Sequence, residues 1–353
     1  MNGLRLEIDL AKIKFNTGTL TDLLAAKGIS VTGITKATLG SPEVAKAMLG
    51  GGCEALGDSR IENIMLMHQG QISSEFNLIR TPMLSQVNEI VRSDLVSFNS
   101  DLIVISHLSA AATRLQRVHN IILMIELGDR REGIMLESVI DSVKSILALP
   151  NICLKGIATN LACRNGVVPD QINMDMLSSL ANEIELNFNI TLEIVSGGNS
   201  ANLRWIFGNF NVGRINNLRL GESILLGREA LNREPIKNLH LDAFSLIAEV
   251  IESIRKPSIP FGKLAQTSSG DFSSAADVGL VNQTILAVGN QDTDTNGLTS
   301  RDGYEIIGSS SDHLIVDSKK ALKVGSEIAF DLNYSALMRA MASPFVQKVF
   351  FHK

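Results

Sequence analysis

Lys36 is the first residue whose type and setting suggest chemistry. It lies in the stretch GITKATLG (33–40), directly behind a short apolar and β-branched run. A charged side chain is costly to bury, and burial lowers the pKa of a lysine from its ordinary value of about 10.4. The neutral amine is a nucleophile for a carbonyl carbon, and an aldehyde cofactor held as a Schiff base is its most natural partner. On this stretch alone, a solvated lysine at a strand end is the alternative.

Two later stretches carry the residue types that bind an anion. SGGNSANL (196–203) has two glycines that permit close backbone approach, followed by Asn199 and Ser200 as hydrogen-bond donors. NNLRLGES (216–223) contributes Gly221 and further backbone N–H groups. Backbone N–H groups and the first turn of a helix favour a phosphate. Two ordinary turns between a strand and a helix are the alternative.

The elements that would position these residues are eight short runs of strand type. They alternate with segments of helical period over the first two thirds of the chain. One such helix, SPEVAKAMLGGG, has Ser41 as N-cap and Pro42 at its first position. Eight strands each followed by a helix predict an α/β protein with a parallel (β/α)₈ barrel of the TIM type. The eight runs are residues 31–37, 54–58, 76–82, 95–100, 121–128, 152–160, 192–200 and 216–223.

In such a barrel, Lys36 closes the first strand, and the two glycine-containing turns follow the seventh and eighth strands. They would therefore meet at one mouth of the barrel, where barrel enzymes place their sites. A lysine facing a phosphate site is the arrangement that pyridoxal phosphate needs. Arg219, inside the eighth strand, would donate to the pyridine nitrogen and leave it without a proton, which disfavours transamination. A salt bridge at the rim is the other interpretation of Arg219.

After about Leu231 the sequence changes to short alternating runs bounded by turn residues, which predicts a C-terminal all-β domain. The segments 266–279 and 290–303 are rich in small polar residues and are predicted to be loops. We therefore place the barrel at residues 10–231 and the β-domain at residues 232–353.

Composition narrows the class of protein. The 353 residues carry a net charge of −5 without a large Lys/Arg cluster, which argues against a nucleic-acid partner and favours a small cationic or zwitterionic substrate. No apolar run approaches the ~18 residues of a membrane span, and the N-terminus is charged throughout. Three cysteines, none in a CxxC pair, predict reduced thiols in the cytoplasm and no metal site.

Several separated stretches resemble the alanine/ornithine racemase family, whose members are pyridoxal-phosphate enzymes of fold type III. The resemblance covers nearly the whole chain. It implies an amino-acid racemase that interconverts L and D enantiomers by removing and returning the α-proton, with ornithine, lysine or alanine as the substrate. It also implies that residues 1–9 join the β-domain and that a homodimer shares its sites between subunits. The stretches are VTGITKATLGSPEVAKAMLGGGCEALGDSRIENI, IELGDRREGI, GIATNLAC, SGGNSANLRWI, NNLRLGESILLGRE and SSDHLIVD.

The resemblance also implies roles for individual residues. Lys36 would be the Schiff-base lysine and one proton-transfer base, and Arg219 would lie at the pyridine nitrogen. Arg131 falls where these racemases carry an arginine beside the cofactor phenolate and the substrate carboxylate, although a surface guanidinium is the other interpretation. Asn160 replaces a histidine that alanine racemases place against the ring. The remaining cofactor contacts would come from Ser196, Asn199, Ser200, Gly221 and Glu222, the last through its backbone N–H.

The second proton-transfer base is the point where the resemblance ends. Alanine racemases take it from a tyrosine of the partner's β-domain. In the corresponding stretch, 262–272, this chain has Ser and Thr, and Thr267–Gly270 replaces the DAFG pattern of ornithine-type members. His313 is the leading candidate because an imidazole exchanges a proton near neutral pH. Tyr334 and Asp292 are the other candidates.

Two other functions use the same type of barrel. A fold type III decarboxylase of basic amino acids would carry a cysteine in its β-domain, but all three cysteines precede that domain. Non-catalytic pyridoxal-phosphate carriers consist of the barrel alone, without a β-domain, which argues against this function. The missing signature of a second base nevertheless keeps it open, including as a degenerate racemase that binds the cofactor without turnover. Among nearby residues, we expect Cys163 to contribute to packing. We expect Asp58 either to bind a polar group or to cap the helix that follows it.

Overall fold

The computed structural model describes residues 3–208, 210–266 and 277–352. The chain divides into two compact units, one of Ala11–Leu241 and one of Met1–Leu10 with Asp242–Lys353. No helix among the described residues is long and apolar enough to cross a membrane. The segment Thr267–Gly270 and most of the loop predicted at 266–279 lie outside the described residues.

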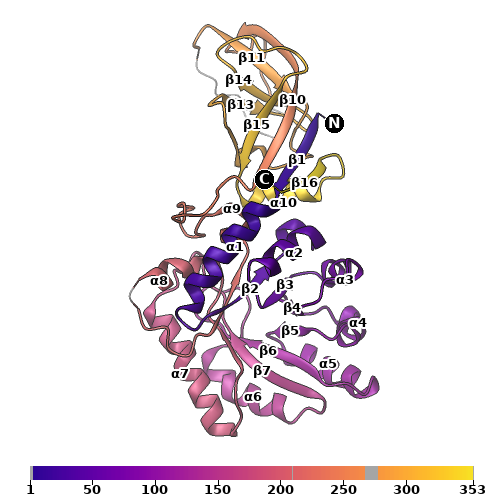
Figure 1. Ribbon diagram of the computed structural model, residues 1–353, viewed down its shortest axis with the longest axis vertical. Coiled ribbons are helices and arrows are strands. Elements are labelled where there is room, and N and C mark those ends of the chain that lie inside the picture. The colour runs from indigo at the N-terminus through magenta and orange to yellow at the C-terminus, as the bar shows by residue number, and fades with distance from the viewer. Residues whose placement is uncertain (1–2, 209, 267–276, 353) are drawn as a thin grey trace. The chain divides into compact units, whose positions relative to one another are not determined.

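The larger unit is a closed barrel of eight parallel strands, which confirms the predicted fold class. Each strand pairs with the next one along the chain, and β9 pairs back to β2. The helices α2 to α7 lie on the outside of the ring (Figure 1). The strands are β2 Ser30–Ile34, β3 Ala55–Asp58, β4 Glu75–Leu78, β5 Val96–Asn99, β6 His119–Met124, β7 Ile152–Ala158, β8 Ile194–Ser196 and β9 Asn217–Leu220.

The helices begin where the sequence offers local caps. At α2, the Ser41 hydroxyl accepts the backbone N–H of Val44 at 3.4 Å, and Pro42 is the first helical residue, as predicted. The helices are α1 Leu10–Ala25, α2 Pro42–Gly50, α3 Ile61–Gln69, α4 Val87–Arg92, α5 Leu102–Arg114, α6 Val139–Leu147, α7 Gln171–Phe188, α8 Leu203–Phe207 and α9 Glu222–Leu226. Short 3₁₀ turns include η1 Lys36–Thr38, η3 Leu136–Ser138 and η4 Ser200–Asn202.

Most strands end earlier than the sequence predicts. The first predicted strand ran to residue 37, but β2 ends at Ile34. The chain turns there because the Thr38 N–H donates to the Thr35 carbonyl at 2.9 Å instead of to a neighbouring strand. Apolar and β-branched residues therefore continue past the sheet into the turns that form the carboxyl end of the barrel.

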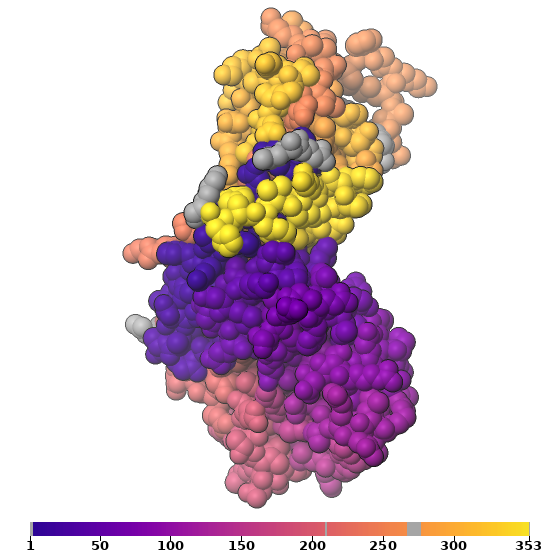
Figure 2. Space-filling model, turned by 45° about the vertical axis from the view of Figure 1, so that its right-hand side comes forward, coloured from indigo at the N-terminus to yellow at the C-terminus, as the bar shows by residue number. Residues whose placement is uncertain are grey.

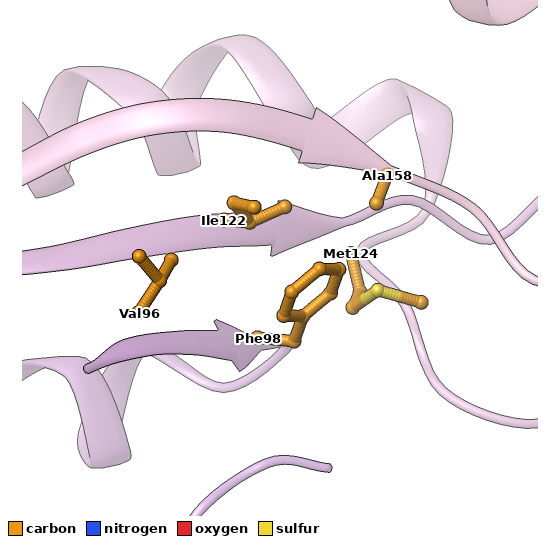
Figure 3. Close-up of a cluster of buried hydrophobic side chains, with 5 residues drawn as sticks. All are labelled: Val96, Phe98, Ile122, Met124 and Ala158. Carbon is orange, nitrogen blue, oxygen red and sulfur yellow. The ribbon is translucent and has the colours of Figure 1, made fainter. Parts of the chain in front are cut away.

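Apolar side chains from adjacent strands fill the barrel (Figure 3). One cluster joins β5, β6 and β7, and each of its members is at most 2% exposed. Burying a side chain of this kind contributes roughly 1.5–3 kcal/mol. The Arg219 guanidinium lies 5.2 Å from the centre of the Phe98 ring, so this cluster also supports a buried cation. The members are Val96, Phe98, Ile122, Met124 and Ala158.

The smaller unit is a mainly antiparallel sheet with strand order β12-β15-β10-β11-β14-β13. Its strand β1 pairs antiparallel with β10 and parallel with β16, so the first and last strands of the chain lie side by side. Figure 2 shows the yellow C-terminal residues beside the indigo N-terminal strand. The strands are β1 Leu4–Asp9, β10 Phe244–Pro257, β11 Leu280–Leu286, β12 Leu298–Ser300, β13 Glu305–Ser309, β14 Leu314–Asp317, β15 Glu327–Leu332 and β16 Gln347–Phe351.

One helix in this unit departs from the all-β prediction. The helix α10 spans Tyr334–Ala342, and the Asn333 side chain accepts the N–H of Ala336 at 2.9 Å as its N-cap. The helix forms because Asn is a strong cap and the buried face of the helix is apolar. The loop predicted at 290–303 also contains the strand β12.

The buried His119 of β6 gives the barrel a pH dependence. Its Nε2 lies 2.8 Å from the Ser97 hydroxyl, and burial lowers its pKa to about 4, with weak opposition from Asp94. The unfolded chain takes up this proton below pH about 6.5, whereas the folded chain does so only near pH 4. Stability from this residue is therefore complete above pH 6.5 and is lost as the pH falls toward 4.

We expect His119 to account for a loss of about 3 kcal/mol of unfolding free energy between pH 7 and pH 4. Urea unfolding of the wild type and of His119→Gln at both pH values measures this loss of unfolding free energy. The variant should be less stable at pH 7 but should have the shallower pH dependence. The exposed His107, replaced by Gln, is the control. An unchanged pH dependence in His119→Gln contradicts the assignment.

Candidate active site

Lys36 lies at the carboxyl end of the barrel, but outside the strand in which the sequence placed it. It opens η1, two residues after β2 ends. The preceding Thr35 fixes this turn, because its N–H donates to the Gly57 carbonyl at 2.9 Å and its hydroxyl donates to Asp58 Oδ2 at 2.8 Å. Both bonds tie the turn to the neighbouring strand β3. The position of the lysine is therefore set by buried backbone contacts rather than by its own side chain.

The Lys36 amine has a lowered pKa. Burial is the main cause, and the positive charge of Arg131 acts in the same direction. The nearby Cys163, Asp58 and Glu132 oppose this lowering. A lower pKa increases the fraction of neutral, nucleophilic amine at neutral pH.

Arg219 lies within β9, as predicted, and is only 5% exposed. Its guanidinium donates to the Ser196 hydroxyl at 2.6 Å, to the Thr159 carbonyl at 2.6 Å and to Asn160 Oδ1 at 3.4 Å. Burial, reinforced by the charge of Arg131, lowers its pKa to about 10. Arg219 therefore remains a cation at neutral pH, held by acceptors from β7 and β8.

The same network continues to Asn199. Its side-chain Nδ2 donates to Asn160 Oδ1 at 3.1 Å and to the Leu161 carbonyl at 2.9 Å. Its Oδ1 accepts the N–H of Ala201 at 2.8 Å and so caps η4. The structure thus joins four of the sequence-predicted residues in one hydrogen-bonded group, namely Asn160, Ser196, Asn199 and Arg219.

The turns after β8 and β9 meet at two serines. The Ser200 hydroxyl lies 3.0 Å from the Ser223 hydroxyl and accepts the Ser223 N–H at 3.2 Å. Gly221 is the N-cap of α9, so this contact joins the starts of two short helical turns. Gly198 has φ +143°, and a Cβ there would collide with Asn202 Oδ1, which explains the requirement for glycine. The sequence reading did not single out Ser223.

Glu222 lies close to Lys36. Burial raises the pKa of Glu222, while the charges of Arg233 and Lys36 lower it. Its Oε1 lies 3.2 Å from Arg233 Nε, and its side chain is 11% exposed. The Glu222 carboxylate therefore already forms an ion pair with a neighbouring arginine.

Two carboxylates that the sequence reading did not single out build the loops after β6 and β7. Glu126 accepts the backbone N–H groups of Gly128 at 2.6 Å, Arg130 at 2.9 Å and Arg131 at 3.2 Å. Asp129 accepts four N–H groups of the next loop at 2.8 to 3.3 Å, from Cys163, Arg164, Asn165 and Val167. The acidic residues of the stretch IELGDRREG (125–133) are the only signal in the sequence, and they do not indicate these partners.

We call the four hydrogen bonds to Asp129 the Asp129 clamp. The clamp holds the loop that carries Cys163 beside Arg131. Arg131 Nη1 donates to Cys163 Sγ at 2.9 Å, and the guanidinium also forms an ion pair with Glu132. Burial lowers the pKa of Arg131, but Glu132 and Cys163 raise it by more. Arg131 is thus a partly exposed cation with a fixed orientation.

The expectation that Cys163 belongs to the packed core is wrong, because its side chain is exposed. Asp58, in contrast, is fully buried and accepts from Thr35, Asn63 Nδ2 at 2.9 Å and the Arg60 N–H at 3.0 Å. These bonds favour the structural alternative for Asp58. Among the described residues, no group of three or more His, Cys, Asp or Glu side chains is arranged to hold a metal ion.

The candidates for the second base belong to the smaller unit. His313 lies in the turn between β13 and β14, with a side chain 43% exposed and Nδ1 3.4 Å from Asp312 Oδ1. Asp292 is buried and accepts the Gly289 N–H at 3.0 Å. Tyr334 is the first residue of α10.

A closed parallel barrel with a half-buried amine and a buried guanidinium at its carboxyl end has the architecture of an enzyme. The family profile described as alanine racemase, N-terminal domain, matches residues 8–228. The chain therefore belongs to the alanine racemase family, and it is an amino-acid racemase.

Individual relatives agree with this membership. A protein named ornithine racemase from Acetoanaerobium sticklandii is 36% identical over 349 residues, 98% of each chain. A protein named lysine racemase from Thermotoga maritima has the same identity and coverage. The solved structure of alanine racemase from Clostridium difficile 630 matches with a TM-score of 0.75 and 17% identity, over 100% of this chain and 97% of that one. At this low identity, the structural match establishes the fold alone.

The Asp129 clamp gives a stability prediction. Burial raises the pKa of Asp129, but the four N–H groups lower it by more, so the net shift is downward. Its stabilising effect is therefore present above the ordinary carboxyl pKa and is lost as the pH falls through the lowered value. We expect Asp129→Asn to cost about 2 kcal/mol and to increase hydrogen exchange at residues 163–167. Urea unfolding and amide exchange measure both effects.

The exposed Asp141 of α6, replaced by Asn, is the matched control. It should leave both measurements unchanged. Native protection of residues 163–167 in Asp129→Asn would show that the clamp does not order this loop.

Proposed function

We propose that this racemase uses pyridoxal 5′-phosphate and acts on a diamino acid, either ornithine or lysine. The observation that carries the proposal is the half-buried Lys36 amine with its lowered pKa, at the same end of the barrel as the buried Arg219. The full-length relatives named ornithine racemase and lysine racemase support this substrate class. Alanine ranks lower because the structures named alanine racemase are 17% identical or less, and the family profile named for it covers the barrel and not the C-terminal domain.

The donor groups present fit this cofactor. Lys36 would hold the aldehyde carbon, and Arg219 would face the ring nitrogen with Asn160, Ser196 and Asn199 around it. The hydroxyl of Ser200 and the backbone N–H groups of Gly221 and Glu222 would hold the phosphate, at the contact between the last two strand-to-helix turns. When bound, the cofactor supplies an electron-withdrawing ring that makes the α-C–H of an amino acid more acidic.

The chain's own residues divide the remaining tasks. The Lys36 amine removes and returns a proton on one face of the α-carbon, because its lowered pKa increases the fraction of neutral amine that can accept a proton. Arg219 keeps its proton at neutral pH, since its pKa is about 10, and therefore donates a hydrogen bond without transferring the proton. Arg131, fixed by Glu126 and Cys163, is available to a substrate carboxylate.

The second face of the α-carbon requires another proton-transfer group, for which we propose His313. We further propose a homodimer whose sites are shared between subunits. The family resemblance supports the dimer, and the exposed imidazole in the smaller unit supports the residue. A cytoplasmic location is also a proposal, supported by the three free thiols.

Proton exchange tests the racemase and its substrate class. The protein with added pyridoxal phosphate is incubated in D₂O with L-ornithine, L-lysine, L-alanine or L-serine, and α-deuterium and chirality are measured. We expect deuterated D-product from ornithine or lysine, faster than from alanine. Lys36→Arg should reduce exchange by about 10³-fold or more, because the proton-transfer amine is lost.

The exposed Lys144, replaced by Arg, is the matched control and should retain full activity. Borohydride reduction followed by peptide mass spectrometry should locate the cofactor on Lys36. Cofactor trapped there without deuterium from any substrate would favour a carrier, and release of carbon dioxide would favour a decarboxylase.

The second base has its own test. We expect His313→Asn to lower racemisation by about 10²- to 10⁴-fold while exchange of the α-proton from one enantiomer continues, because the face served by Lys36 remains active. Deuterium exchange is followed from each enantiomer separately, with the exposed His352, replaced by Asn, as the control. Racemisation at the wild-type rate in His313→Asn would place the second base elsewhere.

A further inference from the structure

Glu132 is an acidic residue among three cations at the carboxyl end of the barrel. Its carboxylate forms an ion pair with the guanidinium of Arg131, and its side chain is 25% exposed. It also acts on Lys36 and Arg219, where it opposes the lowering of the pKa that burial causes. The Glu132 carboxylate therefore lies within electrostatic range of the proposed nucleophile.

The backbone around Glu132 is held at both ends. On the N-terminal side, Glu126 binds the N–H of Arg131 at 3.2 Å. On the C-terminal side, the Ile134 N–H donates to the Met124 carbonyl at 2.8 Å, and the Glu126 N–H donates to the Ile134 carbonyl at 3.0 Å. Gly133 lies between them with φ +150°, where a Cβ would collide with the Glu126 backbone. Arg131 and Glu132 are therefore presented from a fixed turn, as a specificity element requires.

The other carboxylates near Lys36 are less accessible to solvent than Glu132. Asp58 is fully buried and is used by Thr35 and Asn63. Glu222 has an 11% exposed side chain and pairs with Arg233. Glu132 is more exposed than either, and its partner Arg131 is itself 34% exposed at the side chain. A ligand can therefore reach this ion pair from solvent.

We propose that Glu132 selects diamino acids by binding the side-chain ammonium group of the substrate, while Arg131 binds the substrate carboxylate. The inference rests on the proposed function and assigns its substrate specificity to one residue. A substrate with a carboxylate and a second ammonium replaces one internal ion pair with two ion pairs to the ligand. No charge is then left without a partner. Alanine offers a carboxylate to Arg131 and nothing to Glu132, so Glu132 gives it no advantage.

The test compares substrates with and without the distal amine. Glu132→Gln keeps the size of the side chain and removes its charge. We expect kcat/KM for L-ornithine and L-lysine to fall about tenfold to a hundredfold, mainly through KM, whereas kcat/KM for L-alanine changes less than about threefold. Calorimetric dissociation constants for L-ornithine and L-norvaline, which lacks the distal amine, give a readout independent of turnover. The wild type should prefer ornithine, and Glu132→Gln should lose that preference.

Two further variants sharpen the result. The exposed Glu137 of η3, replaced by Gln, should leave intact both the preference of kcat/KM for ornithine over alanine and the preference of binding for ornithine over norvaline. An equal loss of alanine activity in Glu132→Gln would overturn the inference, because Glu132 would then serve only to position Arg131. A Glu222→Gln variant that loses the ornithine preference while Glu132→Gln keeps it would also overturn the inference. Both results would leave the racemase function intact.

The proposed function fails in a different way. If the wild type itself binds and turns over ornithine no better than norvaline and alanine, the diamino-acid substrate class is wrong, and the inference fails with it. If the wild type prefers ornithine and Glu132→Gln retains the preference, only the role of Glu132 is overturned.

Discussion

Closure of the barrel between its first and last strands is the constraint on which the site depends. In the β2–β9 pairing, Thr32 lies opposite Arg219 and Gly33 lies opposite Leu220. This register places Gly221, directly after β9, beside Ile34, so that Lys36 follows two residues later at the same end of the barrel. A shift by one residue would turn the Arg219 side chain to the opposite face of the sheet. The relation between the amine and the guanidinium is therefore a property of strand pairing.

Burial affects the two basic groups differently because their ordinary pKa values differ. Arg219 starts at 12.5 and is lowered to about 10, so it remains a cation and can only donate hydrogen bonds at neutral pH. Lys36 starts lower, at 10.5, and the same kind of burial shifts it toward the neutral form. Burial thus leaves Arg219 a cation held by three acceptors, while it increases the neutral fraction of the Lys36 amine.

Much of this arrangement is readable from the sequence. Eight strand-type runs alternating with helices predict the barrel, and Ser41 with Pro42 predicts the start of α2, because both signals are local or periodic. The position of Lys36 in a turn outside the strand could not be predicted, since hydrogen bonds from Thr35 to β3 hold that turn in place. The Asp129 clamp also could not be predicted from the sequence. A carboxylate that binds backbone N–H groups more than thirty residues away leaves no periodic pattern.

Strands and loops contribute different properties to the site. Arg219 comes from a strand and Lys36 from the turn directly after one, so the barrel itself fixes the positions of these two basic groups. Arg131 and Glu132 come from a loop that two carboxylates hold in place, and Cys163 comes from the loop clamped to it. Loops accept substitution more readily than buried strands. In the function proposed above, the residues that select the substrate can therefore change without moving Lys36 and Arg219, whose positions depend on strand pairing.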